Sequence, residues 1–233
     1  MNQSLYTDFE QAYELNEMEL NHIQLLEMLK NGNIPERQIA AIKIQTIKSQ
    51  EEASILMKNL TGVDGKIREV VALKINNLFL QDDFIKEIFI ADENFVKIFA
   101  DATIDINANI CRLIVDSVAL LAYDSKFSQA YVNYILEYAS VALDELDKFI
   151  FRDKKYVINK QLFKLYWTLE ALKYFVDFAD KIKLESVLSR SITQSEYTIR
   201  EKVAQILVKT NIYPELQMVL KTDENYYVRE AFA

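Results

Sequence analysis

The chain has 233 residues, enough for one large domain or a short array of helical repeats with a continuous core. Its residues are 51% hydrophobic and 27% charged, a globular composition that excludes a disordered chain. The net charge of −8 argues against wide contact with nucleic acid, which needs a basic face. Three glycines and two prolines are too few for the turns of a β-sheet protein, so the composition favours helices.

One cysteine and one histidine limit the chemistry of the chain. Cys111 cannot form an intramolecular disulfide, and His22 alone leaves no His/Cys cluster for zinc. The N-terminus lacks a basic stretch followed by an apolar run, and no apolar run reaches about 18 residues. We therefore expect a cytoplasmic protein without membrane contact, metal or cofactor.

In chain order, the first periodic segment spans Leu15–Leu29, where apolar residues at steps of three and four predict a helix. Asn31-Gly32-Asn33 then breaks the chain. Pro35 follows in the first turn of the next predicted helix, where its missing N–H costs nothing. Three capping-box patterns predict further helix starts: Thr7 with Glu10, Ser49 with Glu52, and Thr198 with Glu201.

The longest predicted helices lie in the middle of the chain. Residues 106–122 predict a helix that is apolar on nearly every side, which makes Cys111 a small core residue. Residues 126–151 and 156–178 predict two longer helices, each with an aromatic stripe beside an aliphatic one. The stripes are Phe127, Tyr131, Tyr134 and Tyr138 on the first, and Phe163, Trp167, Tyr174 and Phe178 on the second.

An internal repeat organises the sequence. Three segments begin with a β-branched aliphatic residue, continue with Arg-Glu and place Ala at the same later position; they start at Ile67, Ile199 and Val228. Three positions before each aliphatic residue lies a polar residue that could cap a helix: Asp64, Glu196 and Asn225. Weaker copies fall at Ile39, Ile110 and Val157. Helical copies spaced by roughly 30 to 47 residues predict stacked helical hairpins.

A capped helix that starts with aliphatic-Arg-Glu and carries a small residue one turn later resembles the second helix of a HEAT repeat. The resemblance covers roughly residues 15–233 and implies an all-α, α-α superhelix: a HEAT-like solenoid of stacked helical hairpins, with about five to six repeats and longer helices in the middle. It implies one domain, with a cap at 1–14, repeats at 15–122, a long hairpin at 123–178 and repeats at 179–233. The last copy stops inside its motif at Ala233, so a fragment of a longer array stays open.

Stacking also suggests a role for the repeated arginines. One hairpin cannot bury its apolar face alone, and neighbours supply the cover. We expect Arg68, Arg200 and Arg229 to be structural residues, making polar contacts between successive second helices.

The HEAT resemblance implies a concave protein-binding face and no chemistry. We therefore predict a non-catalytic protein-binding scaffold, with no catalytic residue. Two alternatives stay open: a nucleic-acid-binding enzyme that resembles HEAT-like DNA glycosylases for alkylated bases, and an accessory subunit that resembles HEAT-like bilin lyases. The first would need an Asp and aromatic residues around a damaged nucleoside, and the only tryptophan, Trp167, lies ten residues from Asp177.

Two groups of residues are candidate binding sites. Tyrosine and tryptophan dominate interface hot spots, and the stripes either pack in the core or supply partner-binding anchors: Tyr131, Tyr134, Tyr138, Trp167 and Tyr174. A basic cluster where the long helices meet is a solvated corner, a phosphate-tracking patch or a dock for an acidic partner: Lys148, Arg152, Lys154, Lys155, Lys160 and Lys164. Residues 1–147 carry a net charge of −12, which favours a basic protein as partner. The sequence leaves the oligomeric state unknown.

Overall fold

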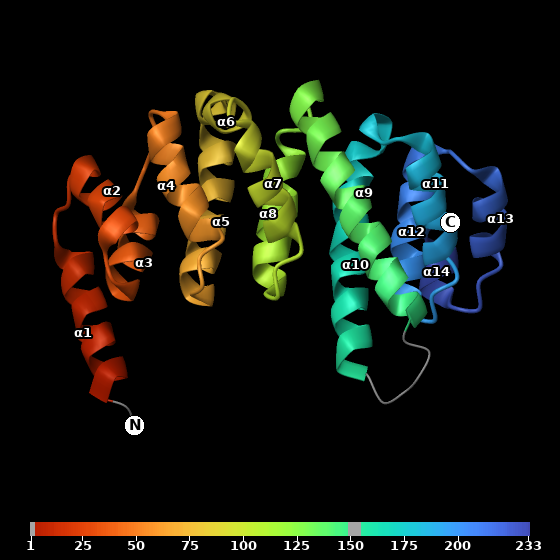
Figure 1. The fold of residues 1–233 in the computed structure, drawn as a ribbon, viewed down its shortest axis with the longest axis horizontal. Coiled ribbons are helices and arrows are strands. Elements are labelled where there is room, and N and C mark those ends of the chain that lie inside the picture. The colour runs from red at the N-terminus through yellow and green to blue at the C-terminus, as the bar shows by residue number, and fades with distance from the viewer. Residues whose placement is uncertain (1–2, 149–154) are drawn as a thin grey trace. The chain divides into compact units, whose positions relative to one another are not determined.

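A computed structural model of the chain describes residues 3–148 and 155–233 (Figure 1). All regular elements in these ranges are helices, so the prediction of an all-α fold is confirmed. The α-helices are α1 (Gln3–Glu17), α2 (His22–Asn31), α3 (Ile34–Lys43), α4 (Gln50–Leu60), α5 (Gly65–Gln81), α6 (Asp83–Ile90), α7 (Glu93–Thr103), α8 (Ala108–Ala119), α9 (Ser125–Lys148), α10 (Lys155–Phe175), α11 (Lys181–Ser191), α12 (Tyr197–Thr210), α13 (Pro214–Lys221) and α14 (Tyr226–Glu230). A short 3-10 helix, η2 (Val176–Phe178), follows α10.

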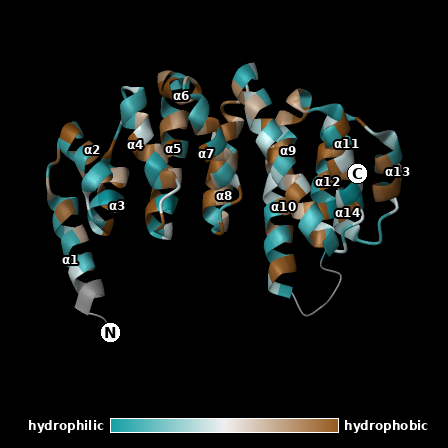
Figure 2. Ribbon diagram, viewed as in Figure 1, coloured by the Kyte–Doolittle hydropathy of each residue, from teal (hydrophilic) through white to brown (hydrophobic). Residues whose placement is uncertain are grey.

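The helices form two compact units. Unit 1 contains the residues up to Ala102 together with Ile106–Leu121, and unit 2 contains Thr103–Asp105 together with the residues from Ala122 onward. Most helices carry hydrophobic residues on one side and hydrophilic residues on another, shown in brown and teal in Figure 2. Burying the apolar sides within each unit removes them from water and stabilises the fold. No helix in the described part of the chain is long and apolar enough to cross a membrane.

In unit 1, helices pack in series against helices two or three places further along the chain. Helix α1 contacts α3, α3 contacts α5, and α5 contacts α8, while α2 contacts α4 and α4 contacts α6. The core contains an aromatic cluster in which the ring centroids of Phe79 and Phe89 lie 5.0 Å apart, edge to face. The fully buried Phe99 lies 6.2 Å from each of them, and such ring pairs stabilise a core beyond their buried area. Cys111 is also fully buried, which confirms that it is a core residue.

In unit 2, the two longest helices, α9 and α10, pack against each other. They occupy the two segments for which the sequence predicts long helices. Helix α10 also contacts α12, and α12 contacts α14, so α12 lies between α10 and α14 (Figure 1). Helices α11 and α13 also pack against α12. Phe178 lies in η2, so it does not continue the aromatic stripe of α10.

The helix starts follow the sequence prediction in part. Ser49 caps α4, since its hydroxyl accepts a hydrogen bond from the Glu52 N–H at 3.3 Å, but the Glu52 carboxylate accepts from the Lys48 N–H and does not complete the predicted box. The other two predicted capping boxes are wrong, because Thr7 lies inside α1 and Thr198 lies inside α12. Two asparagines form complete capping boxes with the residue three positions later: Asn21 with Gln24, and Asn33 with Glu36.

The segment Leu15–Leu29 is two helices, whereas its periodicity predicted one. Helix α1 ends at Glu17, and Asn21 caps the start of α2. The ammonium group of Lys43 donates to the carbonyl oxygens of three residues near the end of α1: Leu15 at 3.1 Å, Asn16 at 2.7 Å and Met18 at 2.7 Å. The break is therefore stabilised from both sides, because carbonyl groups at a helix end need donors from outside the helix.

The three Arg-Glu copies share one local structure. In each copy the Nη1 atom of the arginine donates to the carbonyl groups five and six positions earlier, in the turn before its own helix. Arg68 binds Gly62 and Val63 (both 2.9 Å), Arg200 binds Gln194 (2.8 Å) and Ser195 (3.0 Å), and Arg229 binds Asp223 (2.5 Å) and Glu224 (2.9 Å). These contacts, which we call the arginine clamps, tie each turn to the helix that follows it.

The predicted cap positions of the three copies are all N-cap residues in the structure. Asp64 and Asn225 accept hydrogen bonds from backbone N–H groups in the first turns of α5 and α14. Glu196 occupies the same position before α12, but its side chain makes no capping bond. The copies therefore share the backbone geometry of a helix start even where the capping side chain differs.

Polar side chains also link successive copies within each unit. In unit 2, Arg200 forms a two-pronged ion pair with Asp223, in the turn before α14, with N···O distances of 2.7 and 3.0 Å. Both side chains are less than 10% exposed. In unit 1, Glu69 accepts hydrogen bonds from Asn107 at 2.9 Å and Asn109 at 2.8 Å, and so joins α5 to the start of α8.

Tyr131 is a core residue of unit 2, and its prediction as a partner-binding anchor is wrong. Its side chain is fully buried, and its hydroxyl lies 2.6 Å from the hydroxyl of Thr103. Its ring centroid lies 4.8 Å from that of Phe175 and 5.8 Å from that of Phe127, which stacks on it. The face of α9 that carries Phe127 and Tyr131 thus packs inside the unit.

We expect the variant Tyr131→Phe to lower the free energy of unfolding by about 1 kcal/mol, because the ring stays in place while a buried hydrogen bond is lost. Chemical denaturation measures this difference. Tyr156→Phe is the matched control, since Tyr156 is 81% exposed on α10. Equal stabilities of the two variants would show that the buried hydroxyl contributes nothing.

Candidate protein-binding surface

Helix α10 buries one face completely and keeps aromatic rings on another. Leu165, Leu169 and Leu172 are fully buried against the rest of unit 2. On the other side, Trp167 is half-buried, and its ring lies edge-to-face against both Phe163, at 6.3 Å, and Tyr166, at 5.2 Å. Further along the same helix, Tyr174 is 39% exposed. Trp167 and Tyr174 lie outside the buried leucine face, so their rings are partly exposed at the surface.

Two lysines of α12 lie over the rings of α10. The Lys202 ammonium lies 5.0 Å from the ring centroid of Tyr166, and the Lys209 ammonium lies 4.9 Å from that of Tyr174. Lys209 also donates to the carbonyl of Lys173 at 2.7 Å, near the C-terminal end of α10, where cations are favourable. These cation–π contacts hold the tyrosine rings and the lysines in fixed positions relative to one another.

A carboxylate with two lysine partners lies between the same two helices. Glu170 forms ion pairs with Lys173 on its own helix and with Lys202 of α12, the latter at 2.8 Å. Burial alone would raise the pKa of Glu170, but the hydrogen bonds and charges of the two lysines outweigh it and hold the pKa below its ordinary value. Burial would likewise lower the pKa of Lys202, and the hydrogen bond and charge of Glu170 raise it instead. The two lysines outnumber the carboxylate, so the formal charges of this group sum to +1.

We call the resulting region the α10–α12 surface. It consists of Phe163, Tyr166, Trp167, Glu170, Lys173 and Tyr174 from α10 and Lys202 and Lys209 from α12. Lys202 and Lys209 are seven residues apart, two helical turns, and so share a face of α12. That spacing shows in the sequence that the two lysines share a face, but not that this face meets α10.

The residues of the predicted basic cluster are divided between two helices and a segment outside the described residues. Lys148 lies at the end of α9, pairs with Glu145 at 2.7 Å and has its pKa raised by that hydrogen bond. Lys155, Lys160 and Lys164 lie on α10, the first two exposed and the third half-buried. Arg152 and Lys154 lie outside the described residues.

Lys160 and Lys164 are one helical turn apart, and neither makes a hydrogen bond or ion pair with another residue that the structure describes. Burial, together with the charge of Lys160, lowers the pKa of Lys164. Like charges at this spacing repel and destabilise a helix slightly. The ammonium groups of Lys160 and Lys164 therefore repel each other in the unbound protein, and an anion bound between them would reduce this repulsion.

The three tyrosines of α9 that the sequence predicts as anchors differ in how deeply they are buried. Tyr134 and Tyr138 are half-buried, with ring centroids 6.4 Å apart, whereas Tyr131 is in the core. Trp167 and Tyr174 are the predicted anchors that lie on the α10–α12 surface.

The histidine and the aspartate singled out from the sequence make no metal or catalytic cluster among the described residues. His22 lies 3.0 Å from the Glu52 carboxylate, with its side chain 24% exposed. Asp177 lies in η2 and is exposed. Over the two described ranges, no group of three or more His, Cys, Asp or Glu side chains is placed to hold a metal ion.

No protein-family model matches the chain, and no curated protein matches it. Two engineered proteins of known structure align with 91% of this chain and with 94% and 96% of their own, at 17% and 14% identity and a TM-score of 0.47 each. The Escherichia coli protein YibA aligns with 97% of this chain and 95% of its own, at 12% identity and a TM-score of 0.31. Likenesses this weak assign neither a family nor a function.

Proposed function

We propose that this chain is a non-catalytic protein-binding scaffold, built as a HEAT-like solenoid of stacked helical hairpins. The arginine clamps support this arrangement, because the same contact recurs at three helix starts in two separate units. The links from Arg200 to Asp223 and from Glu69 to Asn107 support it further, since each ties one copy to the next. In such arrays each repeat gains its stability from its neighbours.

The observation that carries the binding function is the partial exposure of Trp167 and Tyr166 on a helix that already has a complete buried face. Large aromatic side chains supply most of the energy at the centres of protein interfaces. Their neighbours already hold these rings, so binding costs little side-chain entropy. The α10–α12 surface is therefore suited to be the centre of an interface.

We propose that its partner presents an acidic segment. The lysines of the α10–α12 surface outnumber Glu170, and Lys160 and Lys164, which have no partner among the described residues, add two more positive charges on α10. Complementary charge speeds association and rejects partners of the same sign. This proposal departs from the basic partner that the acidic N-terminal half favours, because the exposed aromatic rings lie in unit 2.

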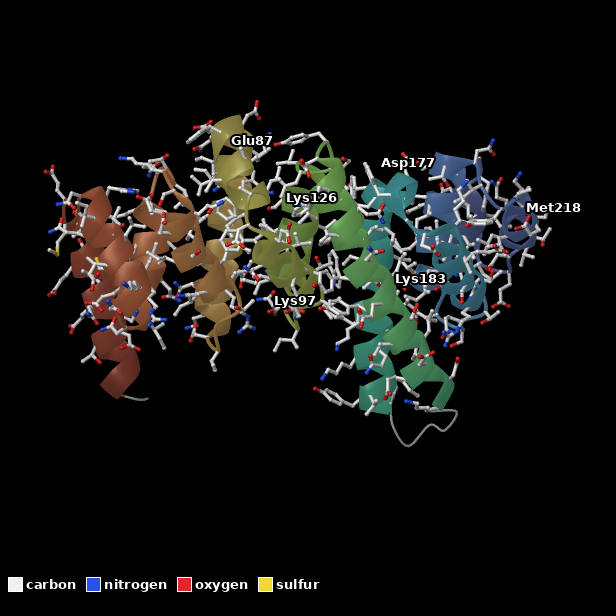
Figure 3. The ribbon with its side chains drawn as sticks, turned by 45° about the horizontal axis from the view of Figure 1, so that its top comes forward. Glu87, Lys97, Lys126, Asp177, Lys183 and Met218 are labelled. Carbon is white, nitrogen blue, oxygen red and sulfur yellow. The ribbon has the colours of Figure 1, made fainter. Side chains whose placement is uncertain are left out.

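Affinity capture from nuclease-treated lysate tests the function, with four forms of the protein as bait. We expect the wild-type protein to retain a protein with an acidic segment, and Lys160→Glu/Lys164→Glu and Trp167→Ala each to lose it. The matched control is Lys181→Glu/Lys183→Glu, which reverses two exposed lysines of α11, where Lys183 is labelled in Figure 3. Circular dichroism establishes that every bait is folded.

The only tryptophan of the chain, Trp167, gives a second readout at the proposed interface. Titration with a synthetic peptide of the captured acidic segment should change its fluorescence and saturate. We expect Lys160→Glu/Lys164→Glu to weaken this binding by about tenfold or more. Capture that is unchanged in Trp167→Ala, or that is replaced by nucleic acid when nuclease is omitted, would contradict the proposal.

A further inference from the structure

A groove runs between α12 and α14 in unit 2, with a volume of about 370 Å³. One ridge of α12 lines it with Glu201, Gln205 and Val208, and α14 lines it with Tyr227 and Glu230. Lys209, which also belongs to the α10–α12 surface, and Ala231 complete the lining. The groove is large enough for a single long side chain.

Tyr227 lines this groove, and two further tyrosines pack against its ring. The rings of Tyr197 and Tyr227 stack with centroids 6.0 Å apart and planes 27° from parallel, and Tyr226 packs edge-on against Tyr227 at 5.6 Å. Tyr227 is 56% exposed and Tyr197 is 36% exposed, so flat aromatic faces meet solvent beside the groove. Aromatic faces carry negative electrostatic potential and attract cations.

The two carboxylates of the groove have no cationic partner among the described residues. Glu201 accepts a hydrogen bond from the amide of Gln205 at 3.0 Å, and Glu230 accepts one from the hydroxyl of Tyr226 at 3.0 Å. Each of these bonds uses one carboxylate oxygen and a neutral donor. Negative charge therefore remains on both sides of the groove.

One cation does lie among the lining residues, but its charge is engaged elsewhere. The Lys209 ammonium donates to the Lys173 carbonyl and lies over the Tyr174 ring, both on α10. It therefore serves the contact between α10 and α12 and leaves the carboxylates of Glu201 and Glu230 unneutralised.

We propose that the α12–α14 groove binds the arginine side chain of a protein partner. A guanidinium is planar, so it stacks on the face of Tyr227 while its N–H groups donate to the carboxylates of Glu201 and Glu230. An ammonium group is compact and strongly hydrated, and it gains less from a flat ring. The groove shares Lys209 with the α10–α12 surface, but the residues proposed to bind the guanidinium, Tyr227, Glu201 and Glu230, lie outside that surface.

Nuclear magnetic resonance titration of the whole chain with N-acetyl-arginine amide tests the site. We expect saturable shifts centred on Tyr197, Gln205 and Tyr227, with a dissociation constant in the millimolar range, as for a single side chain. N-acetyl-citrulline amide has the same shape without the charge, and N-acetyl-lysine amide has the charge without the plane. We expect both to bind at least about fivefold more weakly than the arginine compound.

Variants then place the binding in the groove. Glu201→Gln/Glu230→Gln should weaken binding of the arginine compound by about tenfold, because the amides keep the shape and remove the charge. The matched control, Glu185→Gln/Glu215→Gln, neutralises two exposed residues of α11 and α13 and should bind as the wild type does. Equal binding of the citrulline or lysine compound, no saturation, or full binding by Glu201→Gln/Glu230→Gln would overturn the proposal. Tighter binding of free L-arginine than of the capped compound would overturn a protein partner in favour of the amino acid itself.

Discussion

Replacing Arg200 with alanine is expected to lower the free energy of unfolding by about 3–5 kcal/mol, since it removes one partner of a buried ion pair. The variant leaves the carboxylate of Asp223, only 9% exposed, without the guanidinium that holds it at 2.7 Å. It also removes the clamp on the carbonyl groups of Gln194 and Ser195. Chemical denaturation of the purified protein measures the loss.

Arg229 provides the matched control inside the same molecule. It makes the same pair of carbonyl contacts, to Asp223 and Glu224, but its side chain is exposed. Arg229→Ala should therefore cost about 1 kcal/mol, the net value of hydrogen bonds that water can replace. Equal losses in Arg200→Ala and Arg229→Ala would show that the clamp contributes the stability and the buried ion pair adds nothing.

Acid titration separates the ion pair from the clamp. The hydrogen bonds from Arg200 hold the pKa of Asp223 below its ordinary value of 3.8, although burial acts in the opposite direction. A carboxylate whose pKa is lowered by folding stabilises the protein above its unfolded pKa, and loses that contribution as the pH falls from about 3.8 through its lower folded pKa. The stability gap between the wild type and Arg200→Ala should therefore narrow over this range.

The helical class and the helix starts of the three Arg-Glu copies could be predicted because they depend on local sequence. Few glycines and prolines, together with apolar steps of three and four, are enough to indicate helices. Asp64, Glu196 and Asn225 are N-cap residues where the repeat places them. The break inside Leu15–Leu29 has a local part, the capping box of Asn21 with Gln24, and a nonlocal part, since Lys43 from α3 supplies donors at the end of α1.

The contact partners of the repeated arginines could not be predicted from residue identities. A recurring arginine indicates a recurring contact, but its partners here are backbone carbonyl groups, which every residue possesses. No side chain in the turns Gly62–Val63, Gln194–Ser195 or Asp223–Glu224 is shared among the copies. The sequence could therefore indicate a recurring contact without showing what the arginines bind, and a contact to the next copy is found for Arg200.

Predicting the candidate site requires knowing which aromatic stripe faces the core, and the periodicity of the sequence does not determine this. Tyr131 and Tyr134 are three residues apart on α9, yet the first is fully buried and the second is half-buried. A long helix that is covered on two sides carries apolar residues on both, so its pattern does not identify the exposed side. Lys202 and Lys209 enter the site across the contact between α10 and α12, which only the folded chain determines.

The second large effect is expected at Glu170, whose ion pairs with Lys173 and Lys202 join α10 to α12. All three side chains are less than 20% exposed. Glu170→Met leaves two neighbouring ammonium groups without their carboxylate and should lower the free energy of unfolding by about 2–4 kcal/mol. The pKa of Lys202 should fall in this variant, because Glu170 raises it against the effect of burial.

A double-mutant cycle determines whether the loss comes from the unpaired charge or from packing. Glu170→Met/Lys202→Met replaces the pair by apolar side chains of similar length, and we expect its stability to return to within about 1 kcal/mol of the wild type. Lys173 then keeps a neutral partner, since it donates to Gln205 at 3.3 Å. If the double variant is as unstable as the sum of the single variants, Glu170 and Lys202 do not interact energetically. The contact of α10 with α12 would then depend on the buried leucines of α10. The charged groups of Glu170 and Lys202 would be available to bind the proposed protein partner.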